Sequence, residues 1–263
     1  MVQPAAAGDT DAILRLRDER RRHPEISSIT FPGHSVWRQT YDAIYSHGAI
    51  IENRWVALRI YMNQGHGVDA YLKQRPGLEC RQTGFYTDSI GRAGGLGADV
   101  LYVGSSIGAG SFRGFDGNAA VPLDSVGSRT MAVLNDSTVL LKVEGWHFNG
   151  HDISVTETYT AHAHTRAIDV TITIEGALPA DRFCTGVQKL AVDNSGGFLT
   201  GTHTVAWSRG ANAPDAKRPD MLESVAISVD TPQQVDTVET QLDYLLVFDA
   251  AKDIHYSIQV QRP

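Results

Sequence analysis

The sequence has few cysteines, no long hydrophobic run and no excess of positive charge. Its 263 residues include only 2 Cys, which excludes a small fold held together by many disulfides. No stretch approaches the roughly 20 apolar residues of a membrane-spanning helix, so we expect no membrane partner. The formal net charge is -7, from 23 Lys+Arg against 30 Asp+Glu, and this argues against a nucleic-acid partner.

Several catalytic motifs are also missing. The chain contains no His-Glu-x-x-His, no P-loop and no zinc-type cysteine pair, and we do not expect a serine nucleophile. Cys80 and Cys184 are predicted to be buried free thiols, with one disulfide as the alternative. The first seven residues do not form a signal peptide. We expect a periplasmic or secreted protein if a leader was removed, and a cytoplasmic one otherwise.

The hydrophobic pattern predicts an all-β protein. Residues 9–22 favour a short N-terminal helix, with Asp9 as a cap and Pro24 after its end. From residue 48 onward the period becomes two, which is typical of strands. Many strands at hairpin spacing predict one large antiparallel two-sheet β-sandwich. We expect two parts, an N-terminal helical segment and a single sandwich domain, at residues 1–30 and 31–263.

The expected strands are separated by turn signals and one long irregular stretch. Residues 64–99, dense in Gly and Pro, are predicted to be loop. Asn149-Gly150 predicts a tight hairpin turn. In the strand after it, Glu157 is expected on the apolar face with Val155 and Tyr159. The other predicted strands span residues 48–51, 55–62, 138–148, 152–164, 167–175, 183–192, 198–208, 223–230, 242–249 and 254–261.

Three groups of polar and aromatic residues are candidates for a site. Arg59 and Tyr61 share one face of a strand that follows His47, and a half-buried Arg needs an anionic partner such as Glu52, Asp69 or a substrate carboxylate. His203 and Trp207 are expected on one strand face, where an indole ring can stack on a sugar. His162 and His164 are expected side by side on another strand, which gives a metal site as a weaker alternative. Each group also has a non-functional interpretation: a scaffold ion pair for Arg59, core packing for Trp207, and a solvated outer face for His162 and His164.

Several motifs in order resemble a bacterial family described as a domain of unknown function, found in polysaccharide-degradation gene clusters and including ulvan-oligosaccharide dehydratases. The resemblance covers roughly residues 40–260. It departs from the family pattern at Asn63, where the family has Asp, and at the additional histidine of Ala161-His162-Ala163-His164. The motifs that carry it are Ser46-His47-Gly48-Ala49-Ile50-Ile51-Glu52, Ala57-Leu58-Arg59-Ile60-Tyr61, Val68-Asp69-Ala70-Tyr71-Leu72-Lys73, Thr83-Gly84-Phe85-Tyr86-Thr87-Asp88, Asp99-Val100-Leu101-Tyr102-Val103-Gly104, Arg113-Gly114-Phe115-Asp116-Gly117, Gly145-Trp146-His147-Phe148-Asn149-Gly150, Phe183-Cys184-Thr185-Gly186-Val187-Gln188 and Val205-Ala206-Trp207.

The resemblance implies a mutarotase-like β-sandwich that acts on carbohydrate. Its implied reaction is elimination across C4–C5 of a uronic acid in an acidic oligosaccharide, which makes the protein a carbon–oxygen lyase or dehydratase. Such a reaction needs a cation or amide near the carboxylate and groups that move protons. We therefore expect catalytic roles for His47, Arg59, Tyr61 and His203, and substrate contacts from Tyr86, Arg113, Trp146, Gln188 and Trp207.

Two other functions remain as alternatives. A glycoside hydrolase would need two carboxylates about 5–9 Å apart, and the acids available are Glu52, Asp69, Asp88 and Asp99. A non-catalytic carbohydrate-binding module would show an aromatic face without a cluster of His, Arg and Tyr. No cofactor is expected, apart from the metal alternative. Because the chain is acidic overall, we expect a local patch such as Arg59, Arg81 and Arg113 to meet an anionic sugar.

Overall fold

The computed structural model describes residues 8–18, 20, 23–35, 37–63, 66–87, 91, 93–212, 223–250 and 253–263. These residues form three antiparallel sheets, which confirms the all-β sandwich prediction. The second layer differs from the prediction, because it is divided into two separate five-stranded sheets. None of the described helices is long and apolar enough to cross a membrane.

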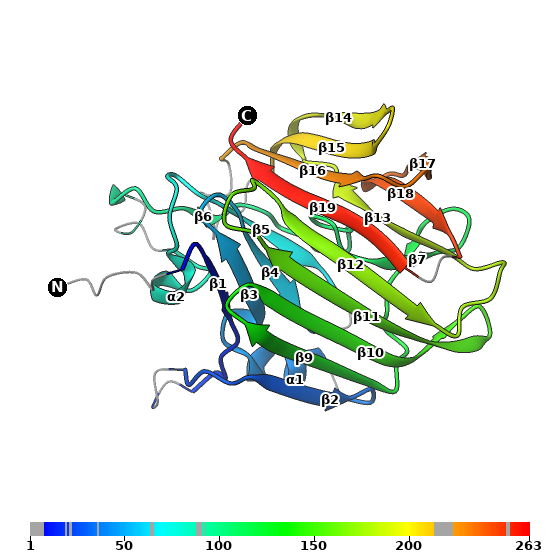
Figure 1. Ribbon diagram of the computed structural model, residues 1–263, viewed down its shortest axis with the longest axis horizontal. Coiled ribbons are helices and arrows are strands. Elements are labelled where there is room, and N and C mark those ends of the chain that lie inside the picture. The colour runs from blue at the N-terminus through cyan, green and yellow to red at the C-terminus, as the bar shows by residue number, and fades with distance from the viewer. Residues whose placement is uncertain are drawn as a thin grey trace.

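A nine-stranded sheet forms one whole layer of the sandwich (Figure 1). Its central hairpin turns at Asn149 and Gly150, which both have positive φ, as the sequence predicted. The next strand, β11, buries every second residue from Ile153 to Ala161, Glu157 included. In sheet order the strands are β14 (Val192–Thr200), β15 (Thr204–Ala211), β16 (Val225–Thr231), β19 (Asp253–Gln261), β12 (Ile168–Glu175), β11 (His151–Ala161), β10 (Thr138–Phe148), β9 (Ser128–Asn135) and β2 (Ser28–Pro32).

The opposite layer contains a sheet that we call the site sheet and a third sheet. The site sheet packs β3 against β9, β10 and β11, while the third sheet packs β13 against β15 and β16. In order, the site sheet contains β1 (Thr10–Ile13), β3 (Gly48–Asn53), β4 (Ala57–Tyr61), β5 (Val68–Leu72) and β6 (Ala98–Asp99). The third contains β17 (Asp236–Glu239), β18 (Asp243–Asp249), β13 (Arg182–Gln188), β7 (Arg113–Phe115) and β8 (Ala120–Val121).

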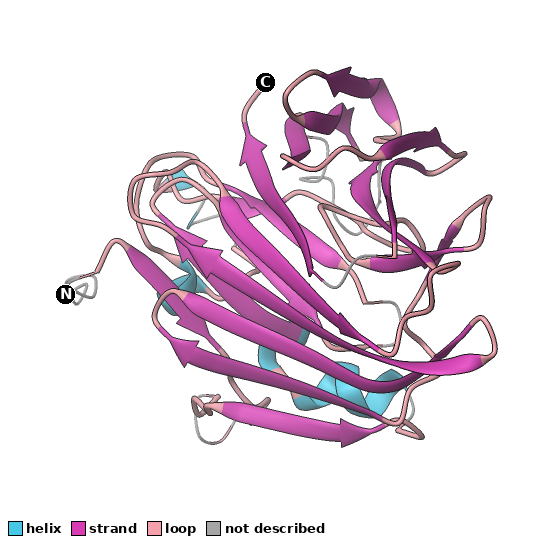
Figure 2. Cartoon of the chain, turned by 45° about the vertical axis from the view of Figure 1, so that its right-hand side comes forward, coloured by secondary structure: helices cyan, strands magenta, loops and turns pink. Residues whose placement is uncertain are grey.

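One continuous hydrophobic core fills the space between the layers. It contains Leu58 and Ile60 from the site sheet, Leu141 from the nine-stranded sheet, and Phe183 and Leu246 from the third sheet. The helices are short and contribute little to it: α1 (Trp37–Ala43), α2 (Cys80–Thr83) and the 3-10 turn η1 (Tyr45–His47) (Figure 2). The fold is therefore stabilised mainly by apolar burial between sheets.

The predicted N-terminal helix is wrong. Residues Thr10–Ile13 form strand β1, which pairs with β3, and Arg15 and Leu16 make further bridges to Glu25 and Ile44. The apolar Ala12, Ile13 and Leu14 are all buried. Burial against the site sheet outweighs the weak intrinsic helix preference of this segment. The domain division at residue 30 stays a prediction.

Two other predicted segments need correction. Residues 64–99 are not simply loop, because they contain β5, α2 and β6. Strand β5 is buried on both faces, so it lacks the alternation that identifies a half-exposed strand. The single strand predicted at 198–208 is a hairpin of β14 and β15, and His203 lies in its turn. Cys80 and Cys184 are both buried free thiols, as predicted.

Candidate functional site

The strand pattern of β4 places two polar residues on the face of the site sheet that points away from the main core. Leu58 and Ile60 pack into the core, so Arg59 and Tyr61 lie on the opposite face. Arg59 is directly opposite Asp69 of β5 in the strand register. Directly opposite side chains are within contact distance in an antiparallel pair, so the register itself brings these two residues together.

Arg59 is a buried cation between two buried carboxylates. Its Nη2 donates to Oδ2 of Asp69 and lies 3.2 Å from Oδ2 of Asp99, while its Nη1 donates to the carbonyl of Ser46 at 3.3 Å. Only 1% of Arg59 is exposed. Burial alone would lower the pKa of Arg59, but the charge of Asp69 and its neighbours raises it overall. The guanidinium is therefore charged and cannot reach a substrate in this arrangement.

Three aromatic rings enclose this guanidinium. The Cζ atom of Arg59 lies 4.3 Å from the ring centre of Phe85, 4.6 Å from that of Tyr61 and 4.7 Å from that of Tyr86. These are cation–π distances, which favour the charged form further. Phe85 is fully buried, whereas Tyr86 is 41% exposed. Phe85 therefore closes the inner side of the cluster, and Tyr86 forms its border with solvent.

Tyr61 and Asp69 form a hydrogen-bonded pair suited to proton transfer. The Tyr61 hydroxyl donates to Oδ2 of Asp69 at 3.2 Å. Burial and the charge of Asp99 raise the pKa of Asp69 to about 7, although Arg59 acts in the opposite direction. Burial and the charge of Asp69 raise the pKa of Tyr61 well above its usual value. The Tyr61 hydroxyl therefore stays protonated at neutral pH, and Asp69 can exchange protons near pH 7.

His47 sits at the edge of the cluster on strained backbone. Ser46 and His47 have φ values of 59° and 65°, a left-handed conformation that is uncommon for residues other than glycine. The imidazole ring of His47 lies 6.0 Å from that of Tyr86, edge to face. Arg17 Nη2 lies 3.3 Å from His47 Nδ1. A guanidinium only donates hydrogen bonds, so the ring nitrogen that it contacts acts as an acceptor.

Arg17 was not predicted as a site residue, because the sequence placed it in a charged surface helix. Its backbone N–H bonds to the carbonyl of Ala43, which aligns residues 15–17 with residues 43–45. The side chain is 36% exposed and also pairs with Asp42 at 3.3 Å. No sequence signal identifies this contact, since it depends on the chain reversal between residues 17 and 43.

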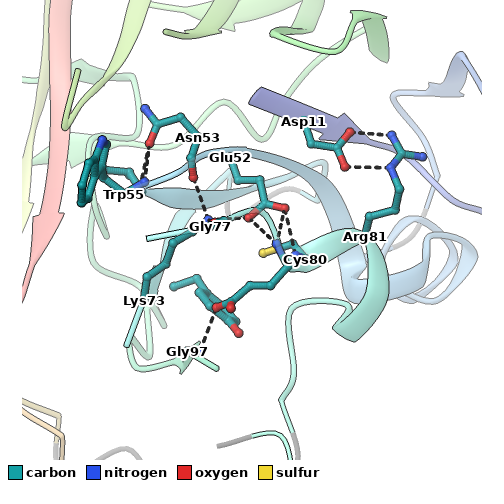
Figure 3. Close-up of polar contacts among 12 residues, drawn as sticks. Asp11, Glu52, Asn53, Trp55, Lys73, Gly77, Cys80, Arg81 and Gly97 are labelled. Carbon is teal, nitrogen blue, oxygen red and sulfur yellow. Dashed lines mark hydrogen bonds and ion pairs between the residues drawn. The ribbon is translucent and has the colours of Figure 1, made fainter. Parts of the chain in front are cut away.

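A second polar network on the same sheet ties strands and loops together (Figure 3). Glu52 is fully buried and accepts from Lys73 Nζ at 2.6 Å and from the backbone N–H of Cys80 at 2.9 Å. Arg81, expected in a cationic patch, pairs with Asp11 on β1 and with Glu25 at 2.7 Å. Glu52 and Arg81 therefore have structural partners and do not belong to the Arg59 cluster.

Arg113, Trp146 and Gln188 lie away from this cluster. Trp146 is 1% exposed and stacks on Phe148, with ring centres 4.6 Å apart, so a sugar cannot reach its face. Arg113 is buried and donates to the carbonyl of Ser106 at 2.6 Å. Gln188 is also buried, and its Oε1 accepts from the Ser106 hydroxyl at 2.9 Å. Both side chains stabilise the loop before β7 in this arrangement.

His203 and Trp207 are also outside the cluster. His203 is exposed in the β14–β15 turn, where its Nδ1 lies 2.8 Å from Oδ1 of Asp230. Trp207 is half-buried on the outer face of β15. The nine-stranded sheet carries both residues near its edge, whereas His47, Arg59, Tyr61 and Tyr86 belong to the site sheet and the segments beside it.

The pair His162 and His164 is not on a strand, because β11 ends at Ala161. Both side chains are exposed, and His162 Nε2 lies 3.0 Å from Oδ2 of Asp169. The shared strand face that supported the metal alternative is therefore absent. Within the described ranges, no three His, Cys, Asp or Glu side chains are grouped to hold a metal ion. Asp88, one of the acids considered for hydrolysis, lies outside the described residues.

Comparison with known proteins identifies a family. No curated protein matches the chain. Among solved structures, the chain is similar to the 4-alpha-glucanotransferase from Thermococcus litoralis, at 10% identity and a TM-score of 0.38. That match covers 82% of this chain but only 38% of the other, so the chain spans well under half of that protein. The family model described as "Domain of unknown function (DUF4861)" matches residues 10–261. Because that match covers nearly the whole sequence, the chain belongs to the DUF4861 family.

Proposed function

We propose that this protein is a carbon–oxygen lyase that eliminates across C4–C5 of a uronic acid in an acidic oligosaccharide. The observation that carries the proposal is the Tyr61–Asp69 hydrogen bond beside Arg59, in a cluster that has His47 at its edge against Tyr86. This set joins a tyrosine hydroxyl that keeps its proton at neutral pH, a carboxyl whose pKa is about 7 and an imidazole with an acceptor nitrogen. Elimination next to a carboxylate needs such proton-transfer groups.

In the proposed reaction, Arg17 turns from His47 to the sugar carboxylate, and the ring nitrogen that it leaves removes the proton from C5 of the sugar. The electrons of the C5–H bond form the C4=C5 double bond, and the C4–O bond breaks. Tyr61 gives its proton to the departing oxygen, which leaves as water from a free 4-hydroxyl or as a sugar hydroxyl from a 4-linked chain. Protonated Asp69 then returns a proton to Tyr61, since their oxygens are 3.2 Å apart. His47 releases its proton to water and Asp69 regains one, which restores the starting state.

The structure changes the role that we assign to Arg59. Its guanidinium is already paired with Asp69 and Asp99 and is almost fully buried, so it acts as a positioning residue. We assign neutralisation of the substrate carboxylate to Arg17, which is 36% exposed and lies beside His47. A cation at this place makes the C5 proton more acidic.

Glycoside hydrolysis has less support from the same residues. A hydrolase needs the scissile bond between two carboxylates. Asp69 and Asp99 both contact Nη2 of Arg59, and each is no more than 2% exposed, so the guanidinium occupies the space where a sugar would lie. A simple binding module has no need for a buried charged pair beneath a tyrosine.

The decisive experiment is incubation with oligosaccharides that end in glucuronate or iduronate. Elimination produces a double bond conjugated with the carboxylate, which absorbs in the near ultraviolet, while hydrolysis produces new reducing ends without that absorbance. We expect absorbance to rise with the wild-type protein and not with His47→Ala. The matched control is His255→Ala, an exposed histidine on β19. New reducing ends without absorbance, or full activity of His47→Ala, would contradict the proposal.

A further inference from the structure

A cavity of about 230 Å³ lies at the other end of the site sheet, and its mouth is lined with arginines. Arg54 belongs to the β3–β4 turn, Arg75 to the loop after β5, Arg166 to the loop before β12, and Arg262 follows β19. Trp55 forms part of the wall. Strand β4 (Ala57–Tyr61) separates the turn that bears Arg54 from Tyr61, and its four residue steps span about 13 Å.

One fully buried asparagine holds three of these loops in place. The side-chain amide of Asn53 donates to the carbonyl oxygens of His162 and Thr165 at 3.1 Å and of Ala167 at 3.2 Å, which fixes the loop that bears Arg166. Its Oδ1 accepts from the N–H of Trp55 at 2.8 Å, which fixes the turn that bears Arg54 (Figure 3).

The third loop is tied to the same residue through its backbone. Lys73 Nζ donates to the carbonyl of Asn53 at 2.7 Å and also contacts the carbonyl of Gly77. These bonds close the segment 73–77, which bears Arg75 (Figure 3). The arginines are thus gathered by a rigid polar framework and are not scattered surface charges.

Three of the four arginines that line this cavity have no carboxylate partner among the described residues. Arg54, Arg75 and Arg166 make no ion pair with any described residue, and all three are exposed. Arg262 pairs with Glu223 at 2.8 Å. Such a concentration of unneutralised positive charge is unfavourable by itself, and it contrasts with the net charge of -7 for the chain.

Trp55 orients two of the guanidinium groups. The Cζ of Arg166 lies 4.5 Å from its ring centre and that of Arg54 lies 5.8 Å away. A guanidinium that stacks on an indole keeps its N–H edge available for a forked pair of hydrogen bonds. The ring faces carry arginines, so this indole orients cations and does not itself stack on a sugar.

We propose that this cavity is an oxyanion-binding site, which holds a sulfate ester or carboxylate of an acidic saccharide through Arg54, Arg75 and Arg166. Binding of the oxyanion does not depend on the elimination chemistry, although the choice of a saccharide as its carrier rests on the proposed function. The length of β4, about 13 Å, means that one monosaccharide cannot contact both sites. The cavity therefore holds a distant unit of a longer chain or a separate molecule.

Isothermal titration calorimetry with the full-length protein at low ionic strength tests the proposal. The probes are inorganic sulfate, inorganic phosphate, glucuronate and glucose 6-sulfate, with glucose as the neutral comparison. We expect saturable binding of glucose 6-sulfate or glucuronate, at least as tight as that of the inorganic ions. Binding should weaken as salt is raised, because ions screen the arginines.

Variants assign that binding to the cavity. Arg75→Gln combined with Arg166→Gln should weaken binding by about tenfold or more, since each substitution removes charge-assisted hydrogen bonds. Arg209→Gln removes an exposed arginine from β15 and should bind like wild type. Wild type, the double variant and Arg209→Gln should all show the same elimination rate on a short uronate substrate. Arg75, Arg166 and Arg209 are outside the Tyr61–Asp69 pair.

The outcomes separate this proposal from the proposed function. Saturable binding that the double variant loses supports the oxyanion site even if no elimination is observed. Absence of binding by any of the four anions overturns it, as does an equal loss in Arg209→Gln. Binding of inorganic phosphate or sulfate without either sugar overturns the assignment to a saccharide.

Discussion

At the scale of single residues, the candidate site depends on how burial and charge act on Asp69. The carboxyl is 1% exposed and has both a cation and another carboxylate beside it. Burial and Asp99 favour the neutral form, and Arg59 favours the charged form. The balance leaves the pKa of Asp69 at about 7. The group therefore changes charge near neutral pH, where a residue that transfers protons is most effective.

Tyr61→Phe tests the proton donor. The variant keeps the ring that packs over Arg59 and removes the hydroxyl that donates to Asp69. We expect the rate of elimination to fall by roughly 10²–10⁴-fold, the usual contribution of general acid catalysis. Tyr102→Phe is the matched control, because Tyr102 is 69% exposed. Equal rates for the two variants would remove Tyr61 from the mechanism.

Asp69→Asn tests the raised pKa through stability. The folded protein holds the proton of Asp69 up to a pH of about 7, whereas the unfolded chain releases it at about 3.9. Between these values the folded state binds more protons, so the contribution of Asp69 makes the free energy of unfolding fall as pH rises. Urea unfolding across this range should show that the free energy of unfolding falls less steeply with pH in Asp69→Asn than in wild type.

The control for that experiment is Asp136→Asn, in the exposed turn between β9 and β10. It should leave the pH dependence of unfolding unchanged, because this carboxyl is exposed to solvent in the folded protein as well as in the unfolded chain. If wild type, Asp136→Asn and Asp69→Asn all show the same slope, the pKa of Asp69 is not raised in the folded protein.

At the scale of elements, short irregular connections place the site residues on a regular sheet. Strands β4 and β5 bring Arg59 and Asp69 together through register alone. His47 instead depends on η1 and on two residues in the left-handed region before β3 begins. Gly48 follows directly, and a β-carbon there would collide with the carbonyl oxygen of Ile60 on β4. The close approach of these strands therefore fixes where His47 lies.

Gly48→Ala tests this close approach. The added methyl group must push β3 and β4 apart, and overpacking of this kind costs about 1–3 kcal/mol of unfolding free energy. We also expect lower activity, because His47 is the preceding residue. Gly201→Ala is the control, since Gly201 has open space around it and lies in the β14–β15 turn. Chemical denaturation should show a loss for Gly48→Ala alone.

At the scale of the whole molecule, one hydrophobic core joins all three sheets. The site sheet and the third sheet lie side by side against the nine-stranded sheet (Figure 1). The site therefore sits on the outer face of a layer whose inner face is anchored in this core. Polar clusters on the outer face are held by a rigid support, which suits a site that must keep its geometry.

Leu141→Ala on β10 tests the core. This side chain is fully buried between the layers, so its truncation should reduce the free energy of unfolding by about 2–5 kcal/mol. Leu134→Ala on the neighbouring β9 is the matched control, because Leu134 is 56% exposed. Its cost should stay within about 0.5 kcal/mol. Similar losses in both variants would contradict a core between the layers.

From the amino-acid order alone we could predict the fold class, most strands of the nine-stranded sheet and the polar face of β4. Those features follow from period-two alternation and from the Asn149-Gly150 turn, which are local properties of the chain. Local alternation also placed Glu157 correctly on the buried face. It failed at β1 and β5, because their residues are buried on both sides or in short bridges and leave no alternation to detect.

Only the tertiary structure decided which residues form the candidate site. The sequence grouped His203 and Trp207 with His47, but the fold places them at another sheet and adds Arg17 instead. It also brings Asp99, which the sequence offered only as an acid for hydrolysis, to Arg59. It also buried Trp146 and gathered Arg54, Arg75 and Arg166 around Asn53. The physical reason is that a strand's pattern reports which side chains share its face, whereas charged partners are brought together by strand register and loop crossings over long sequence distances.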